Sequence, residues 1–451
     1  MPGIVVAETN NTKGIFSVVG FGCLCITYFS KGNVDMIKKE LKKGINLYMV
    51  KDDKFKAFMA YVNIHRPLDK KEVTINTLMA TSMKMKSKNF SSQSEISKEL
   101  ENLYGAQLFS YASKYGERQL IKTGVQSVSD SVLGENGNFE KSMKLLYDIV
   151  LCAGGENGFD ESVVEIEKKN IKDAILSQKN DKRSYSVLRL QEEMCKEEAY
   201  GINPMGYIDK LEKITVAELN SHYKKVISES RIDIIFSGNF DEEKALEAAG
   251  VFSDALCERE ITASEEEIRK APEKVNRVTD KMDVTQGKLC MGWRIDETSK
   301  ENYPAIIVYN SIFGGSAVSK LFNNVREKLS LCYYVGSSID RLKKIMIVRS
   351  GVEFENFVKA YDEIMLQQKM MTDGKFTEEE IDSAKKQLIG AYQSNLDSVS
   401  AMAEYYLMQI LLGTDVSVEK MCEKIRNVSR EEIICAANSM KLDTIYHIDK
   451  E

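Results

Sequence analysis

The pattern of apolar and polar residues predicts a series of strands and helices that occurs twice along the chain, in the same order. In the first pass an apolar strand closes at Gly124-Val125, and helices open at Phe159-Asp160 and at Ile214-Thr215. The second pass has its landmarks, in the same order, at Gly351-Val352, Phe376-Thr377 and Val428-Ser429. Because matching landmarks keep similar separations, the pattern predicts duplication of an α/β unit of about 200 residues.

Capping boxes mark several of the predicted helix starts. In this motif a hydroxyl accepts a hydrogen bond from a first-turn amide, and a Glu reaches back to the cap. The pairs are Ser92 with Glu95, Thr215 with Glu218, Thr377 with Glu380, and Ser429 with Glu432. The helix that Ser92 opens can end at Gly105 in a left-handed conformation. These residues define helix starts and carry no chemistry.

The division between the two passes falls in an acidic stretch from Asp241 to Lys281, which contains Pro272. We therefore predict a first half over residues 37–240, a connector over 241–280 and a second half over 281–451. Few prolines and no low-complexity tracts favour two compact halves.

Residues 1–36 are set apart as an extension. Residues 15–30 are largely apolar, but the run is short for a membrane span and lacks the basic start of a secretory signal. Three interpretations stay open: a disordered or loosely packed extension, a translation start placed too early with Met36 as the true start, and a membrane or export segment. We favour the first and do not expect a membrane partner.

Composition narrows the classes of function. The chain has 451 residues and is 43% hydrophobic, which suits two or three soluble globular domains. Its net charge of -6 gives no basic field that would attract nucleic acid. Nine cysteines without a Cys-x-x-Cys pair argue against a disulfide framework and a thiolate zinc site, and predict a cytoplasmic location. The sequence also lacks a Gly-x-Ser-x-Gly elbow and a Walker loop.

The most distinctive motif lies between Phe313 and Val335, where a Gly-Gly turn, an amphipathic helix and a strand bring Arg326 and Tyr333 to one helix-to-strand junction. This run resembles the second-half signature of the pitrilysin/insulinase metallopeptidases, the inverzincin proteases with an inverted His-x-x-Glu-His zinc motif. The resemblance covers residues 37–451. It implies an α+β or α/β sandwich fold: a duplicated unit of two similar halves, each with a mostly antiparallel sheet covered by helices, facing a cavity.

The histidines needed for that zinc motif are missing. The chain has three, His65, His222 and His447, and no two are close enough in sequence to form it. We expect each to be an ordinary structural or surface histidine. No metal is therefore expected in this chain.

The resemblance also places the lost zinc motif. Counted back from the loop Lys88–Ser91, the five motif positions fall on residues 77–81. Thr77 and Thr81 replace the metal-binding imidazoles, and Ala80 replaces the carboxylate that would take a proton from the bound water. The position of the third ligand falls near Asp173 or Ala174. We expect no catalytic residue in this chain alone.

The resemblance implies that the chain is a noncatalytic subunit of the bacterial, processing-peptidase-like branch of the family. Such a chain would pair with a zinc-binding sister subunit to enclose a peptide or protein substrate, which would add as an extra strand to a sheet edge. Arg326 and Tyr333 would donate hydrogen bonds to the substrate and to the oxyanion of the tetrahedral intermediate. The chain would be inactive alone and would belong to a heterodimeric zinc endopeptidase.

Two other functions stay open. The first is a non-proteolytic peptide-binding or scaffold protein. This function includes a role as an accessory to modification of elongation factor P, because the resemblance extends to zinc-less members of the family that are such accessories. The second is an unorthodox metallopeptidase acting alone, which the missing ligands disfavour. The sequence does not distinguish a homologous partner from a second copy of the same chain.

Overall fold

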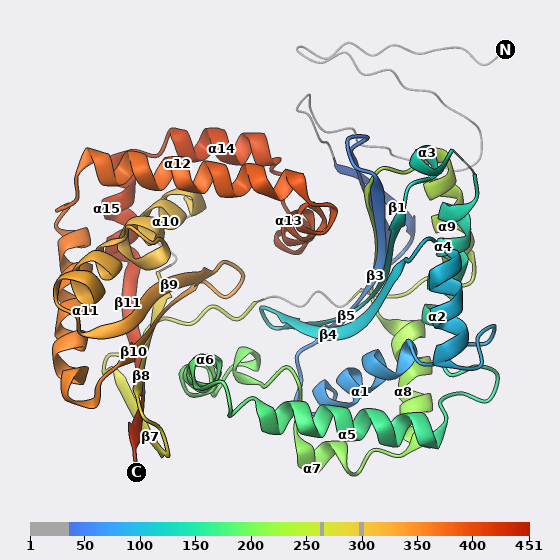
Figure 1. The fold of residues 1–451 in the computed structure, drawn as a ribbon, viewed down its shortest axis with the longest axis horizontal. Helices are drawn as coiled ribbons and strands as arrows, with labels where there is room; N and C mark the ends of the chain where they lie inside the picture. Colours follow the sequence, from blue (N-terminus) through green and yellow to red (C-terminus); the bar gives the residue numbers. More distant parts are fainter. Residues whose placement is uncertain (1–35, 135, 262–265, 297–301) are drawn as a thin grey trace.

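The computed structural model describes residues 36–134, 136–261, 266–296 and 302–451. The extension expected over residues 1–36 lies outside these ranges, apart from Met36, which begins the first strand. Figure 1 shows two sheets, one in each half of the chain, with helices packed around them.

The first sheet has the strand order β1-β2-β6-β3-β5-β4. Its strands are β1 (Met36–Lys42), β2 (Ile45–Lys51), β3 (Ala57–Pro67), β4 (Gln107–Tyr115), β5 (Arg118–Val128) and β6 (Ile232–Gly238). β2 and β6 run parallel, and the other neighbours are antiparallel.

The second sheet has the order β7-β11-β8-β10-β9. Its strands are β7 (Asn276–Met282), β8 (Gly287–Ile295), β9 (Cys332–Asp340), β10 (Ile345–Val352) and β11 (Met440–Lys450). Again one pair, β7 with β11, is parallel. With β1 set aside, the two sheets have the same order and the same single parallel pair. The duplicated, mostly antiparallel fold is therefore confirmed.

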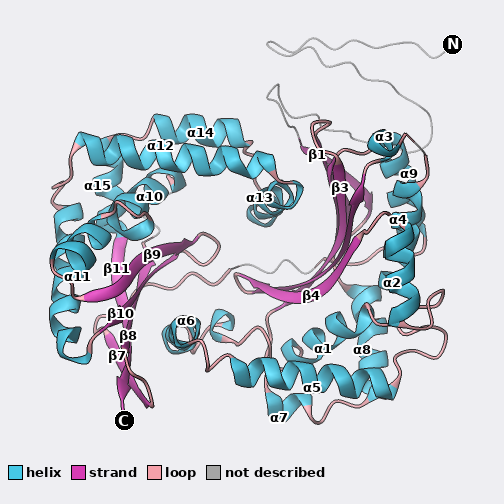
Figure 2. Cartoon of the chain, viewed as in Figure 1, coloured by secondary structure: helices cyan, strands magenta, loops and turns pink. Residues whose placement is uncertain are grey.

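Helices cover the sheets in each half (Figure 2). The first half contains α1 (Val73–Met83), α2 (Gln93–Asn102), α3 (Asp130–Leu133), α4 (Asn138–Leu151), α5 (Glu161–Ser177), α6 (Lys182–Met194), η1 (Ala199–Gly201), α7 (Ile208–Leu211), α8 (Val216–Glu229) and α9 (Glu242–Asp254). The second contains α10 (Tyr303–Asn310), η2 (Ser311–Gly315), η3 (Leu321–Lys328), η4 (Phe354–Asn356), α11 (Phe357–Thr372), α12 (Glu378–Ser394), η5 (Asn395–Asp397), α13 (Val399–Leu412), α14 (Val418–Arg426) and α15 (Arg430–Ser439). The equivalent helices α5 and α12 each have 17 residues and follow a buried Phe, Phe159 or Phe376.

Three of the four expected capping boxes are complete, at Thr215, Thr377 and Ser429. The fourth is half formed. Ser92 accepts a hydrogen bond from the Glu95 amide, but the Glu95 carboxylate accepts from the amide and hydroxyl of the preceding Ser91. The expected left-handed end of that helix is found at Gly105, with φ of 74°.

Each half contributes one helix to the inner face of the other half's sheet. α6, from the first half, packs on β8, β10 and β11, where Leu190 and Met194 meet Tyr446. The equivalent α13, from the second half, packs on β3 and β6, where Met402 and Tyr406 join the first sheet. Figure 1 shows both helices between the two sheets. This exchange ties the halves together, because neither inner face is covered by its own half alone.

Residues 241–280, expected to be a connector, contain regular structure at both ends. α9 packs on β1 and β2 of the first sheet, and β7 begins the second sheet at Asn276. The expected bounds of the two halves, and the cavity expected between them, stay predictions.

Candidate functional site

The positions expected to match the lost zinc motif lie on α1, which is buried against β4, β5, α5, α7 and α8. The hydroxyl of Thr77 lies 3.0 Å from the carbonyl oxygen of Val73 and 3.2 Å from that of Pro204. Gln119 donates to the same hydroxyl from Nε2 at 3.3 Å. Thr77 is therefore a packed residue, held by the chain segment that crosses α1 at Pro204.

The other candidate positions do not fit a metal either. Ala80 is fully buried in the first core, and the Thr81 hydroxyl donates to the carbonyl of Leu78 at 3.2 Å. Asp173 and Ala174, near the expected third ligand, are exposed on α5. Among the described residues, no cluster of three or more His, Cys, Asp or Glu side chains could hold a metal ion. Neither hydroxyls nor a methyl group can replace imidazole or the general base.

His65 belongs to the first sheet. Its Nε2 lies 2.8 Å from Oδ2 of Asp233, which is fully buried and also pairs with Arg231 at 2.8 Å. Burial alone would raise the pKa of Asp233, but His65 and Arg231 outweigh it and hold the pKa at about 2. His65 is therefore the partner of a buried carboxylate.

The other two histidines are also held by protein contacts. His222 Nε2 lies 2.6 Å from Asn76 Oδ1, and burial lowers the pKa of His222 to about 4. His447 packs on the ring of Phe357 with centroids 3.9 Å apart, and burial lowers its pKa as well.

Arg326 and Tyr333 lie on either side of a tight junction between η3 and β9. The helix, wound here as a π-helix, closes where the Ser330 amide donates to the Arg326 carbonyl at 3.0 Å, with Ser330 at φ of 50°. β9 begins two residues later, at Cys332. Both side chains line one cavity of about 440 Å³.

Both members of this pair are available to solvent. The Tyr333 residue is 64% exposed, and the Arg326 side chain is 43% exposed and stacks over Phe322 with 4.7 Å to the ring centroid. Neither side chain is therefore part of the core. The exposed position is what a substrate contact requires.

Two carboxylates that the sequence reasoning missed face the pair. Glu327 lies 3.5 Å from Arg326, and a hydrogen bond with Glu353 raises the pKa of Tyr333. Glu353 follows β10, which pairs with β9, so its position depends on strand pairing. Because Glu353 lies outside the motif, the sequence pattern did not indicate that it would contact Tyr333.

The two sets of candidate residues belong to different halves. α1 packs within the first half, whereas η3 packs on β9, α11 and η2 of the second. The positions expected to match the zinc motif and the Arg326–Tyr333 pair are thus carried by different halves of the duplicated fold.

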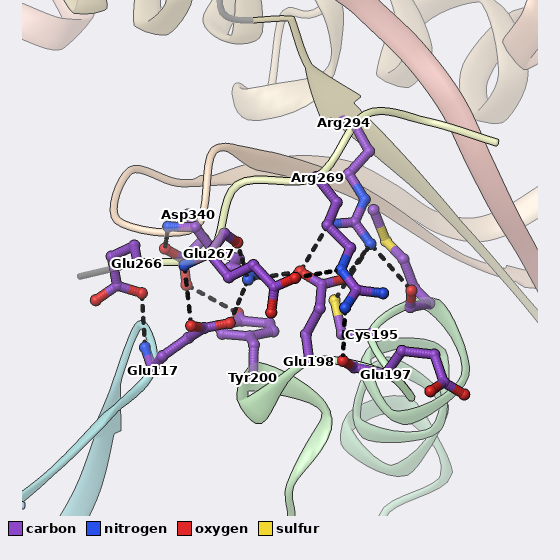
Figure 3. A network of polar contacts seen from close by, with 12 residues as sticks. Glu117, Cys195, Glu197, Glu198, Tyr200, Glu266, Glu267, Arg269, Arg294 and Asp340 are labelled. Carbon is purple, nitrogen blue, oxygen red and sulfur yellow. Dashed lines mark hydrogen bonds and ion pairs between the residues drawn. The ribbon is translucent and has the colours of Figure 1, made fainter. Parts of the chain in front are cut away.

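A buried ionic network joins the halves (Figure 3). Lys343, which follows β9, is fully buried and pairs with Glu198 at 2.6 Å and with Glu117. Arg294 of β8 donates to Glu198 at 3.0 Å and to Asp443 at 2.9 Å. Nearby, Tyr200 donates to Asp340 at 2.8 Å. Their partners are distant in sequence, so no local pattern indicated this network.

A repeated half, an α1 without metal ligands and an exposed Arg–Tyr pair together define a zinc-peptidase fold that has lost its metal site. The family described as "Peptidase M16 inactive domain" matches residues 213–388, which include the Arg–Tyr motif. The chain is 32% identical over 410 residues to "Probable inactive metalloprotease YmfF" of Bacillus subtilis, covering 90% of this chain and 96% of the relative. The chain belongs to the peptidase M16, or pitrilysin/insulinase, family as one of its inactive members.

A more distant relative is named as a zinc protease. "Uncharacterized zinc protease YmxG" of Bacillus subtilis is 23% identical over 312 residues, covering 67% of this chain and 72% of the relative.

Solved structures have the same fold. A conserved protein from Enterococcus faecalis V583 superposes with a TM-score of 0.85 at 27% identity, covering 92% of this chain and 99% of that one. The peptidase M16 inactive domain from Pseudomonas fluorescens gives a TM-score of 0.75 at 16% identity, covering 94% and 98%. The helices of the described ranges include none with the length and apolar character of a membrane span.

Proposed function

We propose that this chain is a noncatalytic subunit that pairs with a zinc-binding sister of the same family and helps to bind a peptide or protein substrate. The sister would supply the zinc, its ligands and the general base. This chain would supply a wall of the substrate chamber and the donors of Arg326 and Tyr333. Free cysteines in the described ranges support a cytoplasmic complex.

The observation that carries this proposal is the contrast between the two sets of family residues. The zinc positions are packed, with Thr77 held by Pro204 and Gln119. Arg326 and Tyr333, in contrast, are exposed and line a cavity. A guanidinium and a phenol at one junction can donate to a substrate carbonyl or to an oxyanion.

A second function is favoured by the carboxylates that face the pair. Glu327 already forms an ion pair with Arg326, and Glu353 already accepts a hydrogen bond from Tyr333. If those contacts are permanent, the pair is structural and the chain is a peptide-binding scaffold without a role in cleavage.

The first experiment measures zinc in the purified chain by elemental analysis. We expect no stoichiometric zinc, because Thr77, Ala80 and Thr81 offer neither ligands nor a base. One zinc per chain that survives dialysis and is lost on substitution near Thr77 would contradict the proposal.

The second experiment reconstitutes the complex with a zinc-type M16 protein from the same organism and follows cleavage of a model peptide. Arg326→Ala and Tyr333→Phe should each lower kcat by about 100- to 1,000-fold, because each removes a donor aimed at the transition state. Lys328→Ala, which removes a charge from the exposed end of the same helix, is the matched control and should leave kcat unchanged.

The same data separate the two functions. If both variants keep full turnover and unchanged substrate binding, the result would favour the scaffold function. Loss of folding stability in either variant would show that the pair is structural, and urea unfolding of the chain alone measures this.

A further inference from the structure

The duplicated fold leaves one strand position empty. In the first sheet β2 is flanked on its outer side by β1, which pairs with it antiparallel. β7 takes the place of β2 in the second sheet, and it is the edge strand there. No described strand lies beyond it. An edge strand presents a row of unpaired N–H and C=O groups to any chain that can lie alongside.

The side chains of β7 alternate regularly in exposure. Val278 and Met282 pack toward the cluster beneath α6. Arg277, Thr279 and Lys281 are exposed on the opposite face. Asp280 lies between Val278 and Met282 on the same face, where it pairs with Arg189 at 3.2 Å and accepts a hydrogen bond from Tyr446. A strand added to this edge would therefore have one largely apolar side, on which the carboxylate is already paired, and one side facing two cations.

A cavity of about 870 Å³ lies at the start of β7, between the end of α6, the segment 269–277 and β11. Its wall includes Lys196, Lys270 and Lys274, and none of these three lysines forms an ion pair with a described residue. The carboxylates deeper in the wall, Glu198 and Asp443, are already neutralised by Arg294.

Opposing charge in this cavity is small. Glu193 is paired with Arg189 at 2.8 Å, so Glu197 is the carboxylate that opposes the three lysines. The chain as a whole carries a net charge of -6, so a local excess of cations stands out from its surroundings.

We propose that β7 accepts an extended acidic segment of another protein as an additional antiparallel strand, with its carboxylates at Lys270 and Lys274. Pairing of the main chains would supply affinity, and the lysines would select acidic side chains. The site is separate from the Arg326–Tyr333 cavity and does not depend on cleavage. Such a segment would attach a substrate or a partner protein to the second half.

Cationic side chains on an edge strand can instead act to prevent pairing with other sheets. If Arg277 and Lys281 only protect the edge in this way, no added strand should bind at β7. The experiment must therefore distinguish edge protection from strand binding.

The experiment measures fluorescence anisotropy of a labelled peptide of alternating Glu and Val, titrated with the full chain. We expect saturable binding that weakens as salt rises, and no binding of the matching peptide of alternating Lys and Val. Two further peptides carry N-methyl groups on either the odd or the even residues. Only one of them should bind, because only alternate amides of an added strand point toward β7.

A pair of substitutions places the binding site. Lys270→Glu with Lys274→Glu should weaken binding by about tenfold or more, since two exposed charge contacts are reversed. Lys169→Glu with Lys386→Glu makes the same change in charge on α5 and α12, away from β7, and should leave binding unchanged.

Three outcomes would overturn the proposal. Equal binding of both N-methylated peptides would mean capture by charge without strand pairing. No binding of the acidic peptide would assign the cations to edge protection. Sedimentation showing that the chain dimerises, with Lys270→Glu and Lys274→Glu abolishing the dimer, would assign the edge to a second copy of this chain.

Discussion

At the scale of single residues, polar side chains on and around α1 form a network of their own. His222 contacts Asn76, and Asn76 donates to Gln119 Oε1 at 2.9 Å. Gln119 in turn donates to Thr77. Buried polar groups must be paired, so these contacts satisfy the polar side chains that α1 carries into the core. The absence of the ligand types could be predicted from residues 77–81, but these replacement contacts could not, since His222 and Gln119 are remote in sequence.

The network makes stability depend on pH. The His222 pKa is about 4 in the folded chain against an ordinary value of 6.5, chiefly because of burial, with Glu72, Arg66 and Lys225 as nearby charges. Between these two pKa values the unfolded chain binds a proton that the folded chain does not. The free energy of unfolding is therefore highest above pH 6.5 and falls as the pH decreases toward about 4.

We expect His222→Gln to remove this dependence while keeping a donor for Asn76. Between about pH 7.5 and about pH 5, the wild-type chain should lose roughly 1–2 kcal/mol more than the variant in free energy of unfolding. Urea titrations at the two pH values measure the difference. Parallel losses in both proteins would show that His222 is protonated in the folded state.

At the scale of elements, the two halves repeat a close contact between a glycine and an aromatic ring. Gly124 of β5 pairs directly with Phe109 of β4, and Gly351 of β10 pairs with Tyr334 of β9. A Cβ at Gly351 would lie 2.5 Å from Cε1 of Tyr334. At Gly124 it would lie 2.4 Å from Cζ of Phe109 and 2.8 Å from the backbone oxygen of Ala60. The aromatic side chain of an edge strand thus covers its neighbour's glycine in each half.

The sequence alone placed these glycines in strands and aligned them across the repeat. It did not show why glycine is needed there, because the reason is the aromatic residue that lies opposite each glycine on the neighbouring strand. The capping boxes were predictable because their partners are three residues apart, whereas the exchange of α6 and α13 joins residues of different halves.

We expect Gly124→Ala to cost about 1–3 kcal/mol or more in free energy of unfolding, because rigid backbone closes one side of the site. Gly351→Ala should cost less, since Tyr334 can turn away. Gly390→Ala, in the open interior of α12, is the control and should stabilise the chain by about 0.5–1 kcal/mol. Urea unfolding measures all three, and equal stability of Gly124→Ala and wild type would contradict the proposed contact.

At the scale of the whole molecule, the two halves meet through an exchanged helix pair and the buried ionic network of Figure 3. Glu198 is the centre of that network. It accepts from Lys343 of the β9–β10 hairpin and from Arg294 of β8, and each of these three side chains is at most 5% exposed. Burial alone would raise the pKa of Glu198, but the two cations outweigh it and lower the pKa. The contribution of Glu198 is therefore present above the ordinary carboxyl pKa and is lost as the pH falls through its folded value.

We expect Glu198→Gln to destabilise the chain by roughly 3 kcal/mol, because Lys343 and Arg294 would each lose a buried counter-charge. Glu197→Gln changes the neighbouring carboxylate, which lines the open cavity, and should be nearly neutral. Adding Lys343→Met to Glu198→Gln removes one of the two cations that lose a counter-charge, and should recover part of the loss, since apolar replacement of a buried ion pair is often neutral. The recovery should be partial, because Lys343→Met also takes the cation from Glu117. Urea unfolding gives the free energies, and hydrogen exchange of α6 reports whether the halves separate. A double variant as unstable as the two single losses combined would show that Lys343 and Glu198 act independently, and that the halves are held by the exchanged helices instead.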